Sequence, residues 1–325
     1  MIKIGQKFRP FSLSPGIFFQ IPGSHLFCRI FPSLIQILDK NNNVLNQLDV
    51  EVSCNNFFCV MQDLHKIGVK VFIGNVRYWI SNKGIIRRGK ALSQKNLFSS
   101  EFLSLGVNKK LDWEMIYRRK NLLEILPLWF RLGILTPKVN LTEDEKKSEN
   151  FLLFSSITKD FFSYSKDQQY QLLHKLFFSC FPFNLVPQQQ NIYLPKIHQK
   201  DFFEQKSLPL FLVREGASFI KSLFIKIENN IFYIFPCLLQ QFHSGRFINI
   251  SCGSLGSIDL KWSKKMIKKI IFRSYQEGII NFLFPKKIVK FRLINLESKE
   301  KKILLTSSFI EIKSKTTYVL DCFQK

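Results

Sequence analysis

The residue types that could do chemistry are spread thinly along this 325-residue chain. Its five histidines lie far apart, and no pair has the spacing of metal ligands. Cys54 and Cys59 stand close together, but no second cysteine pair completes a zinc site. A glycine-rich phosphate loop and a Gly-x-Ser-x-Gly nucleophile motif are both absent from the sequence. We therefore predict no metal site and no cofactor.

One segment in the middle of the chain is dense in polar and aromatic side chains. It places Trp113 between two acids, Arg118 shortly after it, and Trp129 close to Arg131. Trp rings pack on the apolar faces of sugars, and arginine donates hydrogen bonds to hydroxyl groups or anions. These four residues are therefore candidate ligand-binding residues. The alternative is a helix whose Trp113 packs between domains while its charged residues pair on the surface.

A second candidate is the turn His243-Ser-Gly-Arg246, which follows an apolar run. A histidine and an arginine in a glycine-containing turn could both face a ligand, so His243 and Arg246 join the candidate binding surface. The alternative is an ordinary β-turn with an exposed arginine.

The third candidate is the lysine-rich segment around Trp262. Basic residues interleaved with aromatic ones are typical of nucleic-acid-binding surfaces. The basic residues here are Lys261, Lys264, Lys265, Lys268, Lys269 and Arg273. The alternative is that the lysines flank a hairpin turn and point to both faces of a strand, which would dilute any patch.

The charge balance indicates what the chain could attract. Lys and Arg number 48 against 24 acids, for a formal net charge of +24. Such a charge favours nucleic acid or acidic proteins as partners, although a lysine-rich genomic composition would produce it as well. The seven cysteines have irregular spacings, as in a reducing cytoplasm. No stretch reaches the ~18 to 20 apolar residues of a membrane span, so we predict no transmembrane insertion.

The first third of the chain is expected to be β-structure. Short apolar runs alternate with turn signals, and the runs are rich in aromatic and β-branched residues. The predicted strands are Leu26–Phe31, Leu34–Leu38, Phe57–Met61, Val69–Ile73, Val76–Ile80 and Ile85–Arg88. Short strands at this spacing indicate an antiparallel sandwich or barrel.

The middle of the chain predicts helices. A helix over Lys110–Leu126 should end at Pro127. A second should follow Ser165, which with Gln168 forms a capping-box pattern, and bury Leu173, Leu176, Phe177 and Cys180 on one face. Pro209 should open a third helix over Leu210–Phe224. Residues 143–149 read as a solvated linker, and residues 184–204 as irregular.

The final third returns to β-structure. The predicted strands are Ile231–Phe235, Phe247–Ile250, Ser257–Trp262, Met266–Arg273, Ile279–Phe284, Ile288–Leu293, Ile303–Thr306, Phe309–Lys313 and Tyr318–Cys322. We thus predict a β-rich α+β fold. Its N-terminal antiparallel β-sandwich-like domain covers residues 1–103, a short helical section residues 104–224, and a C-terminal antiparallel β-sandwich-like domain residues 225–325.

Part of the C-terminal region resembles a known enzyme family. The run Phe235-Pro-Cys-Leu238, the turn Ser244-Gly245 and the strand ending in Trp262 are similar to the β-sandwich domain of fucosidase-type glycoside hydrolases with an (α/α)6 barrel. The order of parts is similar as well. The resemblance implies sandwich domains, but the middle is too short for twelve barrel helices. No residue matches the catalytic acids of that family, and candidates such as Glu215 or Asp201 have no evident mate.

The segments Leu103-Ser-Leu-Gly106, Asp112-Trp-Glu114 and Trp129-Phe-Arg-Leu-Gly133 make the whole chain resemble uncharacterised conserved proteins of chlamydia-like intracellular bacteria. This resemblance implies a lineage-restricted protein and supplies no activity; we expect a bacterial cytoplasm as its location. The resulting hypothesis is a non-catalytic glycoside-hydrolase-like protein that binds carbohydrate or another macromolecule. The alternatives are a reduced glycosidase, a basic nucleic-acid-binding protein and an effector secreted through a non-classical signal.

Overall fold

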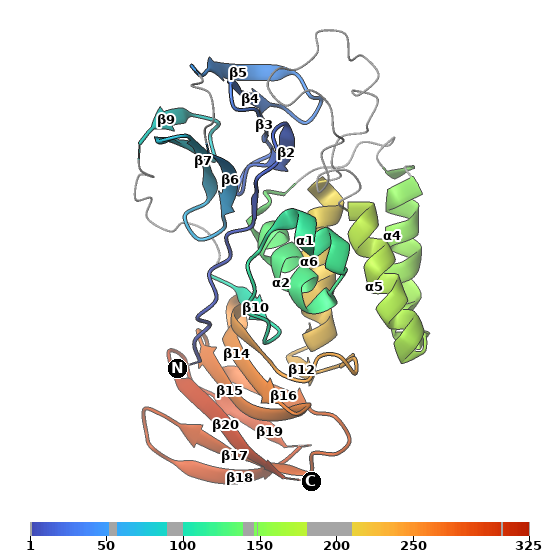
Figure 1. The fold of residues 1–325 in the computed structure, drawn as a ribbon. Helices are drawn as coiled ribbons and strands as arrows, with labels where there is room; N and C mark the ends of the chain where they lie inside the picture. Colours follow the sequence, from blue (N-terminus) through green and yellow to red (C-terminus); the bar gives the residue numbers. More distant parts are fainter. Residues whose placement is uncertain are drawn as a thin grey trace.

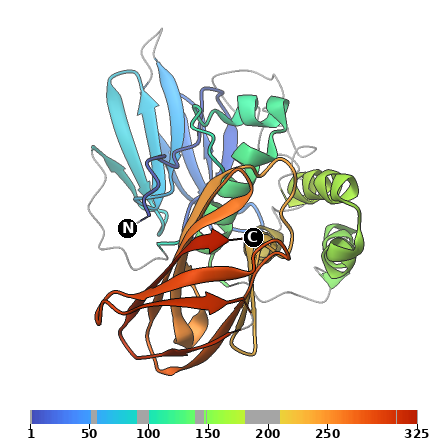
Figure 2. The same ribbon diagram turned by 90° about the horizontal axis from the view of Figure 1, so that it is seen from below.

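The computed structural model describes residues 2–51, 57–89, 100–138, 146–147, 149–180, 210–306 and 308–324. Two regions of β-structure stand at opposite ends of the molecule, and helices fill the space between them (Figure 1). The predicted β-rich α+β fold is therefore confirmed. Seen from below, α4 (Glu149–Asp160) and α5 (Lys166–Cys180) lie to one side of both β regions (Figure 2).

The N-terminal region contains two antiparallel sheets. One has the order β1-β6-β7-β8-β9 and the other the order β2-β3-β4-β5. In the turn that leads into β5, the Asp39 side chain accepts hydrogen bonds from the backbone N–H groups of Asn41 and Asn43, and these bonds stabilise that hairpin. The strands are β1 (Phe11–Ser12), β2 (Ile17–Gln20), β3 (Phe27–Ile30), β4 (Leu34–Leu38), β5 (Val44–Asp49), β6 (Phe58–Asp63), β7 (Gly68–Ile73), β8 (Val76–Ser81) and β9 (Ile86–Arg88).

The predicted helix over Lys110–Leu126 is wrong in its boundaries. The chain forms α1 (Trp113–Arg119) and α2 (Leu122–Leu135) instead, and Pro127 lies inside α2. Lys120 adopts a left-handed conformation that ends α1, and the Asn121 side chain then caps α2. Pro127 is the sixth residue of α2 and removes one backbone hydrogen bond of the helix, yet α2 continues through it because nearly all of its residues are buried in the core.

The other two predicted helices are confirmed. Ahead of α5, Ser165 donates its backbone N–H to Gln168 Oε1 at 3.0 Å, and its hydroxyl oxygen accepts the Gln168 backbone N–H at 3.4 Å, as a capping box requires. Helix α6 (Leu210–Phe224) has the predicted bounds and packs along α2. The sequence did not predict α4. The segment 184–204, expected to be irregular, and most of the linker at 143–149 lie outside the described residues.

The C-terminal region contains a seven-stranded sheet, β10-β13-β14-β15-β20-β17-β18, and a four-stranded sheet, β11-β12-β16-β19. All nine strands predicted for this region are present. The strands are β10 (Phe102–Ser104), β11 (Ile225–Glu228), β12 (Ile231–Ile234), β13 (Gly245–Ser251), β14 (Gly256–Ser263), β15 (Met266–Ser274), β16 (Gly278–Leu283), β17 (Lys290–Asn295), β18 (Lys301–Leu305), β19 (Phe309–Ile312) and β20 (Thr317–Gln324).

The inner faces of these two sheets contact each other through aromatic rings. The rings of Phe232 and Phe272, one from each sheet, lie 5.4 Å apart. The expectation of purely antiparallel sheets is wrong at one pairing, because β12 runs parallel to β16. Strands β13, β14 and β15, all in the other sheet, separate β12 from β16 in sequence, so a crossover joins them.

An extended segment at the beginning of the chain links the two β regions. We call residues 2–10 the N-terminal strap (Figure 1). Ile2 is buried against Ile271 and Val319 on the outer face of the seven-stranded sheet, which is the face turned away from the four-stranded sheet. Phe8 is buried in a ring cluster with His65, which follows β6, and Phe102 on β10. Among the described residues, no helix is both long and apolar enough to cross a membrane.

Candidate functional site

The two tryptophans expected on a ligand-binding surface lie in the core. Trp113 is buried at the start of α1, and its indole N–H donates to Gln62 Oε1 at 3.0 Å. Trp129 is fully buried in α2 and donates to the Val213 carbonyl at 3.1 Å. Both indole donors are therefore satisfied within the protein, and neither ring face is offered to solvent.

Arg131 is also buried. Its guanidinium donates to the carbonyls of Leu64 and Glu101 and lies 3.9 Å from the centre of the Phe102 ring. Burial lowers the pKa of Arg131 to about 10, while the Glu101 carboxylate acts in the opposite direction. The arginine thus holds α2 to the N-terminal sheets and to β10.

The other three candidates are exposed but lie on different elements. Arg118 lies on the surface of α1. His243 lies in the turn before β13, where its carbonyl accepts the Lys265 N–H at 2.9 Å. Arg246 lies on β13 and donates to the Lys3 carbonyl of the strap. The six residues expected to form one surface are thus divided between the core and separate parts of the exterior.

Three buried carboxylates, those of Asp63, Glu124 and Asp259, are held in ion pairs. Asp259 accepts two hydrogen bonds from Arg273, at 3.0 and 2.6 Å, and Glu124 pairs with Arg119. Asp63 is fully buried and pairs with Lys70 at 2.5 Å. Burial by itself would raise the pKa of Asp63, but hydrogen bonds and cations around it outweigh burial and lower that pKa. Asp63 is therefore a poor proton donor at neutral pH.

The cysteines are unreactive where they are buried. Burial raises the pKa of the Cys59 thiol to about 11 and that of Cys252 to about 12. Both thiols are protonated at neutral pH, whereas a nucleophile or metal ligand must be a thiolate. Across the described part of the chain, no three His, Cys, Asp or Glu side chains lie close enough together to hold a metal ion.

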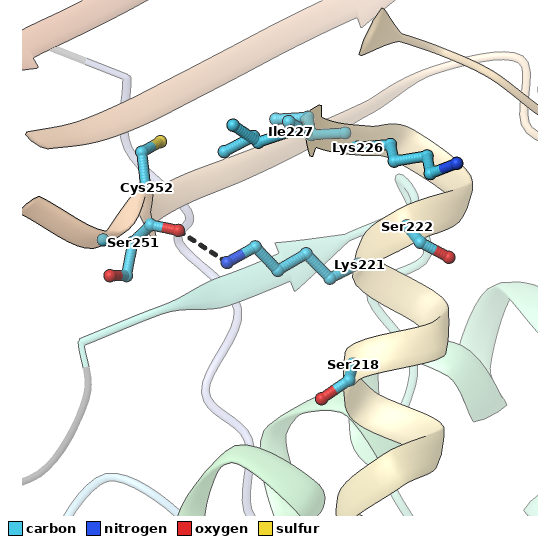
Figure 3. Close-up of a pocket in the computed structure, with 9 residues that line it drawn as sticks. Ser218, Lys221, Ser222, Lys226, Ile227, Ser251 and Cys252 are labelled. Carbon is cyan, nitrogen blue, oxygen red and sulfur yellow. Dashed lines mark hydrogen bonds between the residues drawn. The ribbon is translucent and has the colours of Figure 1, made fainter. Parts of the chain in front are cut away.

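A shallow pocket of about 310 Å³ lies between the last turns of α6 and the connection from β13 to β14 (Figure 3). The Lys221 ammonium crosses it and donates to the Ser251 carbonyl at 2.5 Å. Lys226 points away and pairs with Glu228 at 2.8 Å. The pocket presents ammonium and hydroxyl groups to solvent, and its only thiol, Cys252, is protonated.

A line of basic residues crosses the outer face of the seven-stranded sheet. Arg246 on β13 pairs in register with Lys261 on β14, and Lys261 pairs with Lys269 on β15. Continuing the β15–β20 register places Lys269 opposite Asp321, which is itself opposite Arg292 on β17. We call Arg246, Lys261, Lys269 and Arg292 the cation row. At about 4.8 Å between strands, it spans about 19 Å.

Acids balance only part of this charge. Asp321 pairs with Arg292 at 2.8 and 3.0 Å, and a hydrogen bond from Arg292 is the main cause of the lowered pKa of Asp321. Asp259, on the same face, is already bound by Arg273. No ion pair among the described residues involves Arg246, Lys261 or Lys269. Three cations therefore stand side by side on adjacent strands, although directly opposed like charges destabilise a sheet.

A β-bulge forms this row. Trp262 pairs with Ile267, yet Lys261 pairs with Lys269, so Lys268 is the extra residue. An unbroken hairpin would have placed Lys269 opposite Leu260, whose side chain faces the core. The expectation that the lysines divide between both faces is therefore wrong for Lys261 and Lys269. The lysines are evident in the sequence, but no local sequence pattern predicts the bulge that brings Lys261 and Lys269 opposite each other.

The chain was compared with known proteins. No protein-family model matches it, and no curated protein matches it either.

Proposed function

We propose that the chain is a binding protein that holds the phosphate backbone of a nucleic acid on the cation row. The observation that carries this proposal is the cross-strand register of Arg246, Lys261 and Lys269, none of which forms an ion pair among the described residues, although Lys269 lies opposite Asp321. A phosphodiester backbone carries one charge per nucleotide along a line, and a line of cations on a sheet can follow it. Binding would relieve the repulsion among the three residues.

The surface favours an anion over a neutral sugar. A sugar ligand needs exposed aromatic faces, and the two tryptophans expected to provide them are buried. Arg246, which the sequence assigned to a carbohydrate surface, is part of the cation row. Lys3 is exposed, and its carbonyl accepts the Arg246 hydrogen bond, so the strap brings a further cation to the same place.

The proposal also takes the two β regions as separate sandwich-like units in a bacterial cytoplasm. The ring contact between Phe232 and Phe272 supports this description of the C-terminal unit. A non-catalytic role is supported by the ion-paired state of the buried carboxylates Asp63, Glu124 and Asp259. A glycosidase needs one protonated and one free carboxyl group in a shared site.

The test is fluorescence anisotropy with a labelled single-stranded DNA oligonucleotide over a range of salt concentrations. On a single strand, each phosphate contact lowers the slope of the logarithm of the affinity against the logarithm of the salt concentration by about 0.7. If each of the four residues of the cation row contacts one phosphate, we expect a slope of about −3. The double variant Lys261→Glu and Lys269→Glu should bind at least about tenfold more weakly at low salt and show a shallower slope.

The matched control changes the same charge elsewhere. Lys40→Glu with Lys83→Glu alters two exposed lysines of the N-terminal region and should keep most of the affinity. Equal losses in both double variants would mean that net charge alone attracts the oligonucleotide. Absence of binding by the unmodified protein at low salt would refute the proposed function.

A further inference from the structure

A protruding corner of the C-terminal region exposes several large apolar side chains. Figure 1 shows β17 and β18 at the extreme end of the molecule, opposite β4 and β5. There β18 ends at Leu305, whose carbonyl accepts the Ser308 N–H at 3.0 Å, and β19 begins at Phe309. The Thr306 N–H donates to the Val289 carbonyl at 3.0 Å, which brings the start of β17 to the same place.

The exposure of these side chains is unusually high for residues of their size. Ile303 is 74% exposed, Phe309 72%, Leu305 56% and Val289 51%. Ile303 and Leu305 share one face of β18, opposite Arg292 and Lys290, and Val289 and Phe309 lie on the segments beside the end of that strand. Single exposed apolar residues are common on protein surfaces, but four at one corner mark a contact surface. Strands β18 and β19 are also the last strands of their sheets among the described residues.

Lysines surround this apolar group. Lys286 and Lys287 lie just before Val289, and Lys290 pairs in register with Leu305. No ion pair among the described residues involves these three lysines. From residue 284 to residue 325 the sequence has ten Lys and Arg against four acids. We call the seven residues Val289, Ile303, Leu305, Phe309, Lys286, Lys287 and Lys290 the basic apolar corner.

The nearby acids do not cancel this charge. Glu300 pairs with Lys302 at 2.9 Å, and Asp321 pairs with Arg292. Glu297 accepts the Thr317 backbone N–H. Glu311 is exposed on β19, two residues beyond Phe309. The lysines at the corner therefore remain available to an anionic partner.

We propose that the basic apolar corner docks the protein on an anionic lipid surface. The apolar side chains would enter the boundary between headgroups and acyl chains, and the lysines would contact the anionic headgroups. Lysine is depleted in protein–protein interfaces, whereas clusters of lysine beside apolar groups are typical of surfaces that bind anionic membranes. The corner projects from the end of the molecule, so a bilayer can reach it without touching the helices or the N-terminal sheets.

Cosedimentation with lipid vesicles tests this proposal. Vesicles of phosphatidylcholine mixed with phosphatidylserine should carry the protein into the pellet, and vesicles of phosphatidylcholine alone should carry much less. Leu305→Ser with Phe309→Ser should lower the partition coefficient by about tenfold or more, and Lys286→Glu with Lys287→Glu should do so by a similar factor.

The control removes equally exposed apolar side chains at the far end of the molecule. Val44→Ser with Leu45→Ser on β5 should leave vesicle binding unchanged. Phe309→Trp adds a direct measurement, because insertion should shift the tryptophan emission to shorter wavelength only when anionic vesicles are present. Ile303 lies opposite Arg292, so the corner adjoins one end of the cation row. Lys261 and Lys269 lie on β14 and β15, at least three strands from β18, and Lys261→Glu with Lys269→Glu should therefore keep vesicle binding.

Three results would overturn the proposal. The protein could stay in the supernatant with anionic vesicles. The second is that the variants at the corner bind anionic vesicles as strongly as the unmodified protein does. The third is that neutral vesicles bind the unmodified protein as strongly as anionic vesicles do. Finally, if Phe309→Ser abolished self-association in solution while vesicles bound nothing, the corner would be a contact between copies of the chain.

Discussion

The guanidinium of Arg131 lies 3.9 Å from the centre of the Phe102 ring, and this contact joins α2 to the first strand of the seven-stranded sheet. The same side chain donates to the carbonyl of Leu64, which follows β6. One buried arginine thus connects the helical layer to both β regions. The segment that the sequence assigned to a ligand surface instead holds the molecule together.

Replacing Arg131 should therefore destabilise the whole fold. Arg131→Met leaves the carbonyls of Leu64 and Glu101 without their donor in a buried place, at a cost of about 3 to 5 kcal/mol in the free energy of unfolding. Urea denaturation measures this loss. Arg118→Met, on the exposed surface of α1, should change stability by less than about 0.5 kcal/mol. Similar effects of the two substitutions would contradict the structural role of Arg131.

Gly216 on α6 should not tolerate alanine, although alanine is the better helix former. A Cβ at this position would overlap the Trp129 ring. The usual gain of about 1 kcal/mol from removing a helical glycine should therefore be reversed, to a net loss of about 1 to 3 kcal/mol by thermal unfolding. Ser218→Ala, on the exposed side of the same helix, is the control and should be neutral or slightly stabilising. A stabilised Gly216→Ala would show that α2 and α6 are less closely packed than described.

His65 should make the fold sensitive to mild acid. Its Nε2 accepts the Phe8 N–H at 2.9 Å, and burial is the main cause of its lowered pKa. The folded pKa therefore lies below the unfolded value of about 6.5. As the pH falls through that range the unfolded state takes up the proton first, so His65 should contribute a loss of stability with a slope of at most one proton, and His174, whose pKa burial also lowers, should add a second contribution.

The measurement is the free energy of unfolding between pH 7 and pH 5. His65→Gln should remove this part of the pH dependence, whereas His243→Gln, in an exposed turn, should keep it. The lowered pKa of Asp63 places the titration of that carboxyl at more acidic pH, below its ordinary value of 3.8. An unchanged pH profile in His65→Gln would disprove the assignment.

The cation row predicts opposite effects on stability and on binding. Lys261→Gln removes the central charge of three adjacent cations and should stabilise the protein at low salt by about 0.2 to 1 kcal/mol. Added salt should reduce that gain, since it screens exposed charges. The same variant should bind the oligonucleotide more weakly. A loss of stability at low salt would mean that Lys261 makes favourable contacts instead of repelling its neighbours.

Much of the secondary structure could be predicted from local signals. Pro209 and the apolar periodicity after it define α6, and Ser165 with Gln168 defines the start of α5. The break between α1 and α2 could not, because the apolar periodicity continues across Lys120 and the left-handed turn depends on a single residue followed by a capping Asn121. Pro127 predicted the end of a helix, but the burial of α2 in the core carries the helix through it.

The candidate site was harder to predict, because it depends on tertiary position. Trp113 and Trp129 have the residue type of a binding surface, and only the packing of α2 against α6 shows that Trp129 is enclosed. The cation row depends on the bulge at Lys268, which changes the partner of Lys269 from a core residue to Lys261. A shift of one residue in the register moves a side chain to the other face of the sheet, and no local sequence pattern predicts the bulge that causes this shift.

The N-terminal strap constrains the order in which the molecule can be completed. Ile2 packs against Val319, more than three hundred residues further along the chain. During synthesis Ile2 must therefore wait, uncovered, until strand β20 has left the ribosome. Contacts between such distant positions form late and slow the final step of folding. The closing of the strap over β15 and β20 is thus a natural last event, and a probe attached near Ile2 would report when the whole chain has reached its native state.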